Sequence, residues 1–134
     1  MAEFAIVLTA SLTLILGIID AGRALYTDHL ISNAARMGAR YAMVRGAGCT
    51  VAGCPASQSS IQTYVRGLAP ELNQAAITVN TTWTTTSTCT TAPANSAGCL
   101  VTVTVTYPFR FAAVPLLPNF PMSMTSTSKM VMSQ

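Results

Sequence analysis

Charged residues and histidine are scarce in this sequence. Asp, Glu, Lys and Arg make up only 8% of its 134 residues, with four carboxylate side chains and one histidine. His29 adjoins Asp28 on a predicted helix, where sequence neighbours point to different faces, and no Ser or Cys stands in a recognisable nucleophile setting. We therefore expect neither enzymatic activity nor a cofactor. The net charge of +3 is scattered along the chain, so we expect no nucleic-acid partner.

Proline is absent before Pro55, and charge is absent from Phe4 to Ile19. Leu, Ala, Ile and Met dominate the region, which predicts one unbroken helix from Ala2 to Arg45. Such a helix would be about 65 Å long. The rest of the chain is too small to bury it, so its apolar first half must be covered from outside.

Lipid or copies of the same helix could provide that cover. The sixteen uncharged residues span about 24 Å, less than the roughly 30 Å of a bilayer's hydrocarbon core. No basic segment precedes the run and no cleavage site follows it, so it fits a signal peptide poorly. Small residues such as Gly17 and Ala21 would let a second backbone approach closely. The pattern favours burial among identical helices.

The whole chain predicts an α+β fold in two regions, a long helix in residues 1–46 and a head in residues 47–134. The helix has an apolar half (2–22) and an amphipathic half (23–45). The second half has one apolar stripe that is expected to pack on a sheet, formed by Leu30, Ala34, Met37, Tyr41 and Val44. Residues 57–68 predict a short helix. Alternation predicts strands in 76–84, 100–111 and 122–132, hence an antiparallel sheet of about three strands. Three prolines in 112–121 predict a loop.

All four cysteines lie after the long helix, at Cys49, Cys54, Cys89 and Cys99. Local pairing, Cys49 with Cys54 and Cys89 with Cys99, would close two loops, and the two other connectivities stay open. Each disulfide would contribute on the order of 2–3 kcal/mol to stability. The spacings match no common zinc pattern. Disulfides predict that the head lies in an oxidising compartment, outside the cytoplasmic membrane.

The first 46 residues resemble a known family, in the run AEFAIVLTASLTLILGIIDAGRALYTDHLISNAARMGARYAMVRG. Its elements E-F-A, G-I-I-D-x-G-R and N-A-A-R-x-G-A-R-Y-A are similar to the N-terminal signature of TadE-like proteins, the pilin-like and pseudopilin components of Tad (tight-adherence) pili. VTVTVTYPF and TSTSKM resemble that family's C-terminal strand pair. The family's precursors have a basic leader ending in Gly, with an acid shortly after the cut. Here the acid is Glu3 and the printed sequence shows no leader, which leaves open a processed form or a start that escapes processing.

The resemblance implies a bacterial protein that enters the inner membrane, is cut by a prepilin peptidase and is passed by the pilus assembly machinery into an extracellular helical filament of identical subunits, used for adhesion. Glu3 leads an apolar run, where an unpaired charge is expensive. We expect it to pair with an α-amine, a neighbour's or its own, and to set the axial stagger, although the helix dipole alone also favours an acid there. Phe4, Gly17 and Ala21 are expected at the contact between helices. Asp20 and Arg23 are expected to pair within the helix or to bridge subunits.

Two other functions fit the sequence. One is a minor pseudopilin that primes or caps the filament, and the other is a membrane-tethered module whose head binds a ligand outside the cytoplasm. Asn80-Thr81-Thr82 is an N-x-T sequon, which makes Asn80 a candidate for N-glycosylation. The alternative is that this segment is an ordinary threonine-rich strand face.

Overall fold

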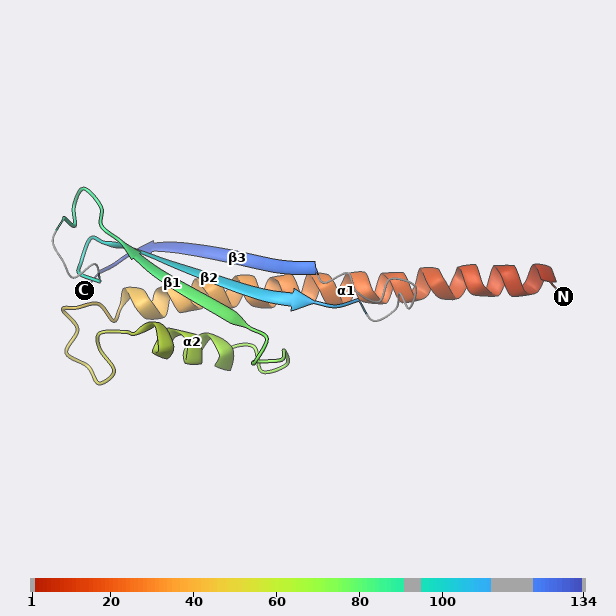
Figure 1. Ribbon diagram of the computed structural model, residues 1–134, viewed down its shortest axis with the longest axis horizontal. Helices are drawn as coiled ribbons and strands as arrows, with labels where there is room; N and C mark the ends of the chain where they lie inside the picture. Colours follow the sequence, from red (N-terminus) through yellow and green to blue (C-terminus); the bar gives the residue numbers. More distant parts are fainter. Residues whose placement is uncertain (1, 91–94, 112–121, 134) are drawn as a thin grey trace.

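One long helix organises the molecule. The computed structural model describes residues 2–90, 95–111 and 122–133, so the loop predicted at 112–121 lies outside the described residues. Helix α1 (Ala2–Met43) extends along most of the length of the molecule. Its second half lies along a small sheet, and its first half projects beyond the head to the N-terminus at the far tip (Figure 1). The fold is α+β, as the sequence predicts.

Helix α1 continues for 42 residues because no proline or capping sequence interrupts it. Glu3 in its first turn and Arg40 in its last turn both have the charge that the helix dipole favours at that end. The helix ends at Met43, two residues before the predicted end, in a turn that leads into Gly46. The predicted single helix is therefore confirmed almost to the residue.

The head contains a three-stranded antiparallel sheet in the order β1-β2-β3, made of β1 (Thr78–Thr84), β2 (Leu100–Phe109) and β3 (Met122–Val131). Valines of β1 and β2 point inward and form the core. Threonines line the outer face, where the hydroxyls of Thr104 and Thr127 lie 3.1 Å apart and those of Thr106 and Thr125 lie 3.2 Å apart. The alternation of valine and threonine thus produces a sheet with one apolar face and one polar face.

The short helix α2 (Gln58–Gly67) contacts both α1 and β1. Its N-cap is Ser57, whose hydroxyl accepts a hydrogen bond of 3.2 Å from the backbone N–H of Ser60. Ile61 and Val65 are fully buried on its inner face. Arg66 donates to the carbonyl oxygen of Ile77 over 3.1 Å, which ties α2 to the segment leading into β1.

Helix α1 packs on the sheet mainly through small residues. Of the predicted stripe, Ala34 is fully buried and Tyr41 packs against the core, whereas the other large side chains are not in its centre. Leu30, Met37 and Tyr41 are only half-buried, and Val44 is exposed. The buried positions of this half are Ile31, Ala34, Ala35, Gly38, Ala39 and Ala42. Short side chains allow the helix backbone to approach the sheet closely, and the larger side chains then lie at the edges of the contact. Tyr41, for example, stacks on Tyr64 of α2 with ring centroids 4.4 Å apart.

Two disulfides close the longer loops of the head. Cys49 is bonded to Cys54 before α2, and Cys89 is bonded to Cys99 between β1 and β2. Cys89 and Cys99 are buried and belong to the hydrophobic core. Both bridges are local, because they join cysteines 5 and 10 positions apart. Each therefore fixes one loop without linking the head to α1.

The close approach of α1 predicts a large penalty for any side chain at Gly38. A β-carbon there would lie 2.6 Å from Cγ2 of Val65 and 3.4 Å from Cγ1 of Val103. Both valines are fully buried and β-branched, so neither can turn away without disturbing its neighbours. Gly38→Ala is expected to lower the free energy of unfolding by about 1–3 kcal/mol. Denaturant unfolding of the full chain in detergent micelles, followed by the fluorescence of Trp83, measures this value.

Gly22→Ala is the matched control for Gly38→Ala. No heavy atom lies within 4 Å of the position that a β-carbon at Gly22 would take. Alanine is about 1 kcal/mol more favourable than glycine inside a helix, so the control variant should be as stable as the parent or more so. Equal stability of the two variants would contradict the close packing at Gly38.

A buried hydroxyl generates a second prediction. Thr81 is buried in β1, and its Oγ1 atom has no hydrogen-bond partner among the described residues. Thr81→Val replaces that hydroxyl by a methyl group of similar size, and is expected to raise the free energy of unfolding by about 1 kcal/mol. Thr82→Val, at the adjacent exposed position, should change it by less than about 0.5 kcal/mol. A lower stability for Thr81→Val in the same assay would show that the hydroxyl is satisfied.

Candidate assembly surface

The first half of α1 is almost bare. Ten large apolar side chains between residues 4 and 19 are from 43% to 73% exposed, namely Phe4, Ile6, Val7, Leu8, Leu12, Leu14, Ile15, Leu16, Ile18 and Ile19. Among the described residues, α1 is the one helix that is long and apolar enough to cross a membrane. Its apolar window is mostly unburied, which distinguishes it from the core helix of a soluble protein. Either lipid or other helices can cover such a surface.

The two threonine hydroxyls within this half are satisfied by the helix itself. Thr9 Oγ1 donates to the carbonyl oxygens of Ala5 and Ile6, both at 2.9 Å, and Thr13 Oγ1 donates to that of Thr9 at 2.8 Å. A hydroxyl that is bonded to its own helix does not need water. These threonines therefore make the surface less polar than their side chains alone suggest.

The predicted contact residues lie at two levels of the bare half. Glu3 and Phe4 are exposed at the tip, and no described residue pairs with the Glu3 carboxylate. Gly17 and Ala21 are exposed one turn apart, and no heavy atom lies within 4 Å of the position that a β-carbon at Gly17 would take. Residues four apart share one side of a helix. The two small residues thus form a shallow depression on one side of α1.

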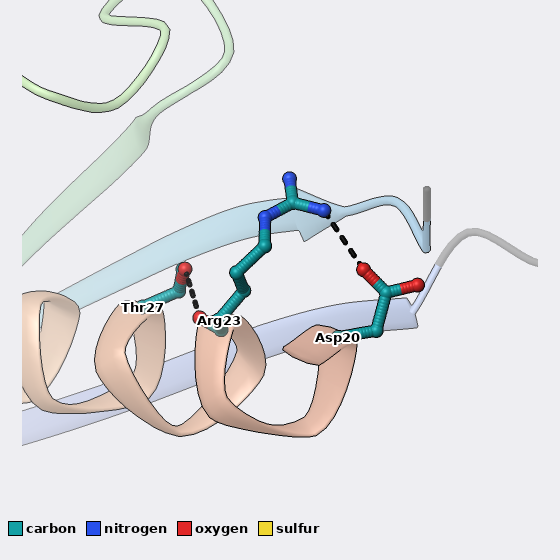
Figure 2. Close-up of polar contacts among 3 residues, drawn as sticks. All are labelled: Asp20, Arg23 and Thr27. Atoms are coloured by element: carbon teal, nitrogen blue, oxygen red, sulfur yellow. Dashed lines mark hydrogen bonds and ion pairs between the residues drawn. The ribbon is translucent and has the colours of Figure 1, made fainter. Parts of the chain in front are cut away.

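An ion pair marks the boundary between the bare half and the head. Asp20 Oδ1 lies 2.8 Å from Nη1 of Arg23, and the Thr27 hydroxyl donates to the Arg23 carbonyl oxygen over 2.9 Å (Figure 2). Asp20 is 3% exposed, whereas the Arg23 side chain is half-exposed. The Arg23 guanidinium also lies 5.7 Å from the centre of the Phe109 ring. The pair forms within one helix, which is one of the two arrangements that the sequence allowed.

A cavity of about 560 Å³ opens at the same level, at the base of the head. Side chains from α1, from the segment after α2 and from the end of β2 line it. Tyr26 Oη donates to Glu71 Oε2 over 2.5 Å at this site. The hydrogen bond to Glu71 is the largest cause that raises the pKa of the Tyr26 hydroxyl above its ordinary value, with smaller effects of desolvation and of the Glu71 charge. The phenol therefore remains a donor at neutral pH.

Sequence reasoning singled out Arg23 but missed Tyr26, Glu71 and Arg110 at this cavity. Tyr26 and Glu71 are 45 positions apart, and no local spacing connects them. Arg110 directly follows β2 and lines the same cavity. Glu71 and Arg110 lie just beyond the ends of α2 and β2, whereas Tyr26 lies in the middle of α1, so no shared sequence signal marks the three residues.

The remaining candidates lie elsewhere on the head. Asn80 is exposed on the outer, threonine-lined face of β1, where its side chain is accessible. Within the described ranges, no group of three or more His, Cys, Asp or Glu side chains is placed to hold a metal ion. The two candidate functional surfaces are therefore the bare half of α1 and the cavity at its upper end.

Comparison with known proteins supports the family expected from the sequence. Residues 1–40 match the family model described as TadE-like protein. No curated protein and no solved structure matches the chain. The matched residues include the whole bare half of α1, the Asp20–Arg23 pair and most of the buried face that packs on the sheet. Over residues 1–40, which form most of the long helix on which the rest of the molecule is built, this chain is similar to TadE-like proteins.

Proposed function

We propose that this protein is a structural subunit of a Tad-type pilus, and that it assembles with identical copies through the bare half of α1. The observation that carries the proposal is the set of ten exposed apolar side chains on a helix whose second half is already packed. Complete covering of one Leu, Ile or Phe side chain contributes about 1.5–3 kcal/mol. Ten such side chains exceed the roughly 4–15 kcal/mol that association costs in lost freedom.

Lipid covers the same surface before assembly. The uncharged run is shorter than a typical membrane span, and its threonine hydroxyls are satisfied within the helix. Insertion of this helix into a bilayer is therefore favourable but weak. A weakly held helix suits a subunit that must leave the membrane. In this proposal a prepilin peptidase and the pilus assembly machinery process and extract the subunit. The heads then face outward from an extracellular filament that serves adhesion.

Glu3 sets the axial register between neighbouring subunits in the proposed filament. Its carboxylate has no cation nearby in the described chain, and it stands at the tip of an apolar segment. Burial among neighbouring helices would leave it unpaired unless another group meets it. An α-amine, from a neighbour or from the same subunit, supplies the opposite charge. Because the pair forms at one height only, it sets the axial offset between subunits.

The first test of assembly removes this charge. Glu3→Gln keeps the size of the side chain and is expected to abolish filaments in negative-stain images of the purified protein, because the axial pair is lost. The near-ultraviolet circular dichroism of the head should not change. Asp28→Asn, an exposed acid on the packed half of α1, is the matched control and should form normal filaments. Normal filaments from Glu3→Gln would contradict the role of Glu3.

The second test distinguishes a polymer from a tethered binding module. Gly17→Leu adds an apolar side chain where the single chain has open space, so the isolated subunit should fold normally. In a polymer the added bulk is expected to block close helix approach and to reduce filament mass by at least about tenfold. Ile18→Leu, which keeps volume and apolarity at the next position, should assemble normally. Filaments from both variants, or detergent-stable monomers from the unmodified chain, would favour the membrane-tethered module.

A further inference from the structure

The cavity at the base of the head stands at a defined height above the bare half of α1. Ile19 is the last residue of the apolar run, and Arg23 and Tyr26 of the cavity follow it by four and seven positions. At 1.5 Å per residue these positions lie about 6–11 Å beyond the apolar run. The polar layer of a bilayer occupies about 5–8 Å on each side of the hydrocarbon core. When lipid covers the apolar run, the Arg23 side of the cavity therefore lies at the level of the lipid headgroups, and Tyr26 lies just beyond them.

The side chains around the cavity suit that position. Tyr26, Tyr107 and Phe109 line it, and aromatic residues are enriched where a membrane meets water. Arg23 and Arg110 line it as well, and arginine matches the geometry of phosphate. This combination of rings and guanidinium groups indicates a ligand that carries phosphate at a membrane surface.

Charges of both signs make the cavity selective. Arg23 is paired with Asp20 through Nη1, and its Nε and Nη2 atoms have no hydrogen bond among the described residues. Arg110 has no ion pair among those residues. Glu71 accepts from Tyr26 through Oε2, which leaves Oε1 available as an acceptor. The two acids balance the two arginines, so a ligand with a net negative charge gains no overall attraction, whereas a ligand with both charges can satisfy both sets of groups.

We propose that this cavity binds the headgroup of an aminophospholipid, with the phosphate at Arg23 and Arg110 and the primary ammonium at Glu71. The inference rests on the membrane stage of the proposed function. A volume of about 560 Å³ accommodates a headgroup of this size. A choline headgroup has no N–H to donate to Glu71, and a glycerol headgroup has no positive charge. The bound lipid holds the subunit at a fixed depth until it enters the filament.

The test is lipid retention by the full-length chain. The protein is released for native mass spectrometry from detergent micelles that contain equal amounts of phosphatidylethanolamine, phosphatidylcholine and phosphatidylglycerol. One phosphatidylethanolamine per chain should be retained in preference to the other two. Arg110→Gln and Glu71→Gln should each reduce that retention by about tenfold, because each removes a charge-assisted hydrogen bond. Arg23 is left intact, because its loss would leave the buried Asp20 carboxylate without its cation.

Arg36→Gln and Asp28→Asn are the matched controls, since both positions are exposed on α1 and neither lines the cavity. They should retain lipid as the parent does. Equal retention of the three lipids, or no effect of the cavity variants, would show adsorption to the apolar helix and overturn the inference. Displacement of the lipid by inorganic phosphate would overturn it in favour of a simple anion site.

Negative-stain imaging of the same variants separates this inference from the proposed function. Filaments from a parent chain that shows no lipid preference would remove the lipid site and leave the assembly proposal standing. Loss of filaments in Arg110→Gln or Glu71→Gln, with lipid retention unchanged, would make the cavity a contact between copies and overturn the lipid inference. Retention that falls only in the cavity variants supports it.

Discussion

Ten apolar side chains that the head does not cover determine what α1 can do. Their exposure to water is unfavourable, and the head already uses the other half of the helix. The backbone of the bare half makes its hydrogen bonds within the helix. These hydrogen bonds are therefore satisfied both in lipid and among other helices. This property allows one segment to have two successive surroundings without refolding. A bare strand in the same place would have unpaired backbone groups and could not make that change.

Small residues serve both halves of α1, but with different partners. In the packed half, alanines and Gly38 bring the helix backbone close to the sheet and to α2, and the valines of β2 fill the remaining space. In the bare half, Gly17 and Ala21 present the same shallow surface with nothing against it. The packed half thus shows within one molecule the kind of close contact that we propose between copies in the filament.

Much of this fold could be predicted from the sequence, because its signals are long and regular. The uninterrupted run from Ala2 predicts α1, and the alternation of Val and Thr predicts β2 to within two residues of its end. The face of α1 that packs on the sheet could not be predicted by looking for large apolar residues. Leu30 and Val44 look like core residues, yet a close backbone approach excludes them from the centre of the contact.

The cavity could not be predicted from the sequence for a related reason. Its polar residues come from three elements, and only the packing of α1 against the loop after α2 brings Tyr26 to Glu71. The pairing of Asp20 with Arg23 was more accessible, because a spacing of three residues on a helix limits the choices. What the spacing did not reveal is that the acid is buried while its partner remains half-exposed beside the cavity.

The acids at the two ends of the apolar run differ in whether a cation of the described chain pairs with them, so the two ends of this run are not equivalent. Asp20 is neutralised within the chain by Arg23, so the upper end can rest beside lipid headgroups or beside other helices without a net charge. Glu3 has no such partner in the described chain, so the lower end becomes stable in an apolar surrounding only where a positive group from outside the head meets it. If both ends were neutralised internally, copies of the helix could slide along one another, since apolar contacts specify no single offset. In the filament that we propose, one unsatisfied charge at one end removes that freedom, because a shift of one turn would separate the proposed pair by about 5.4 Å.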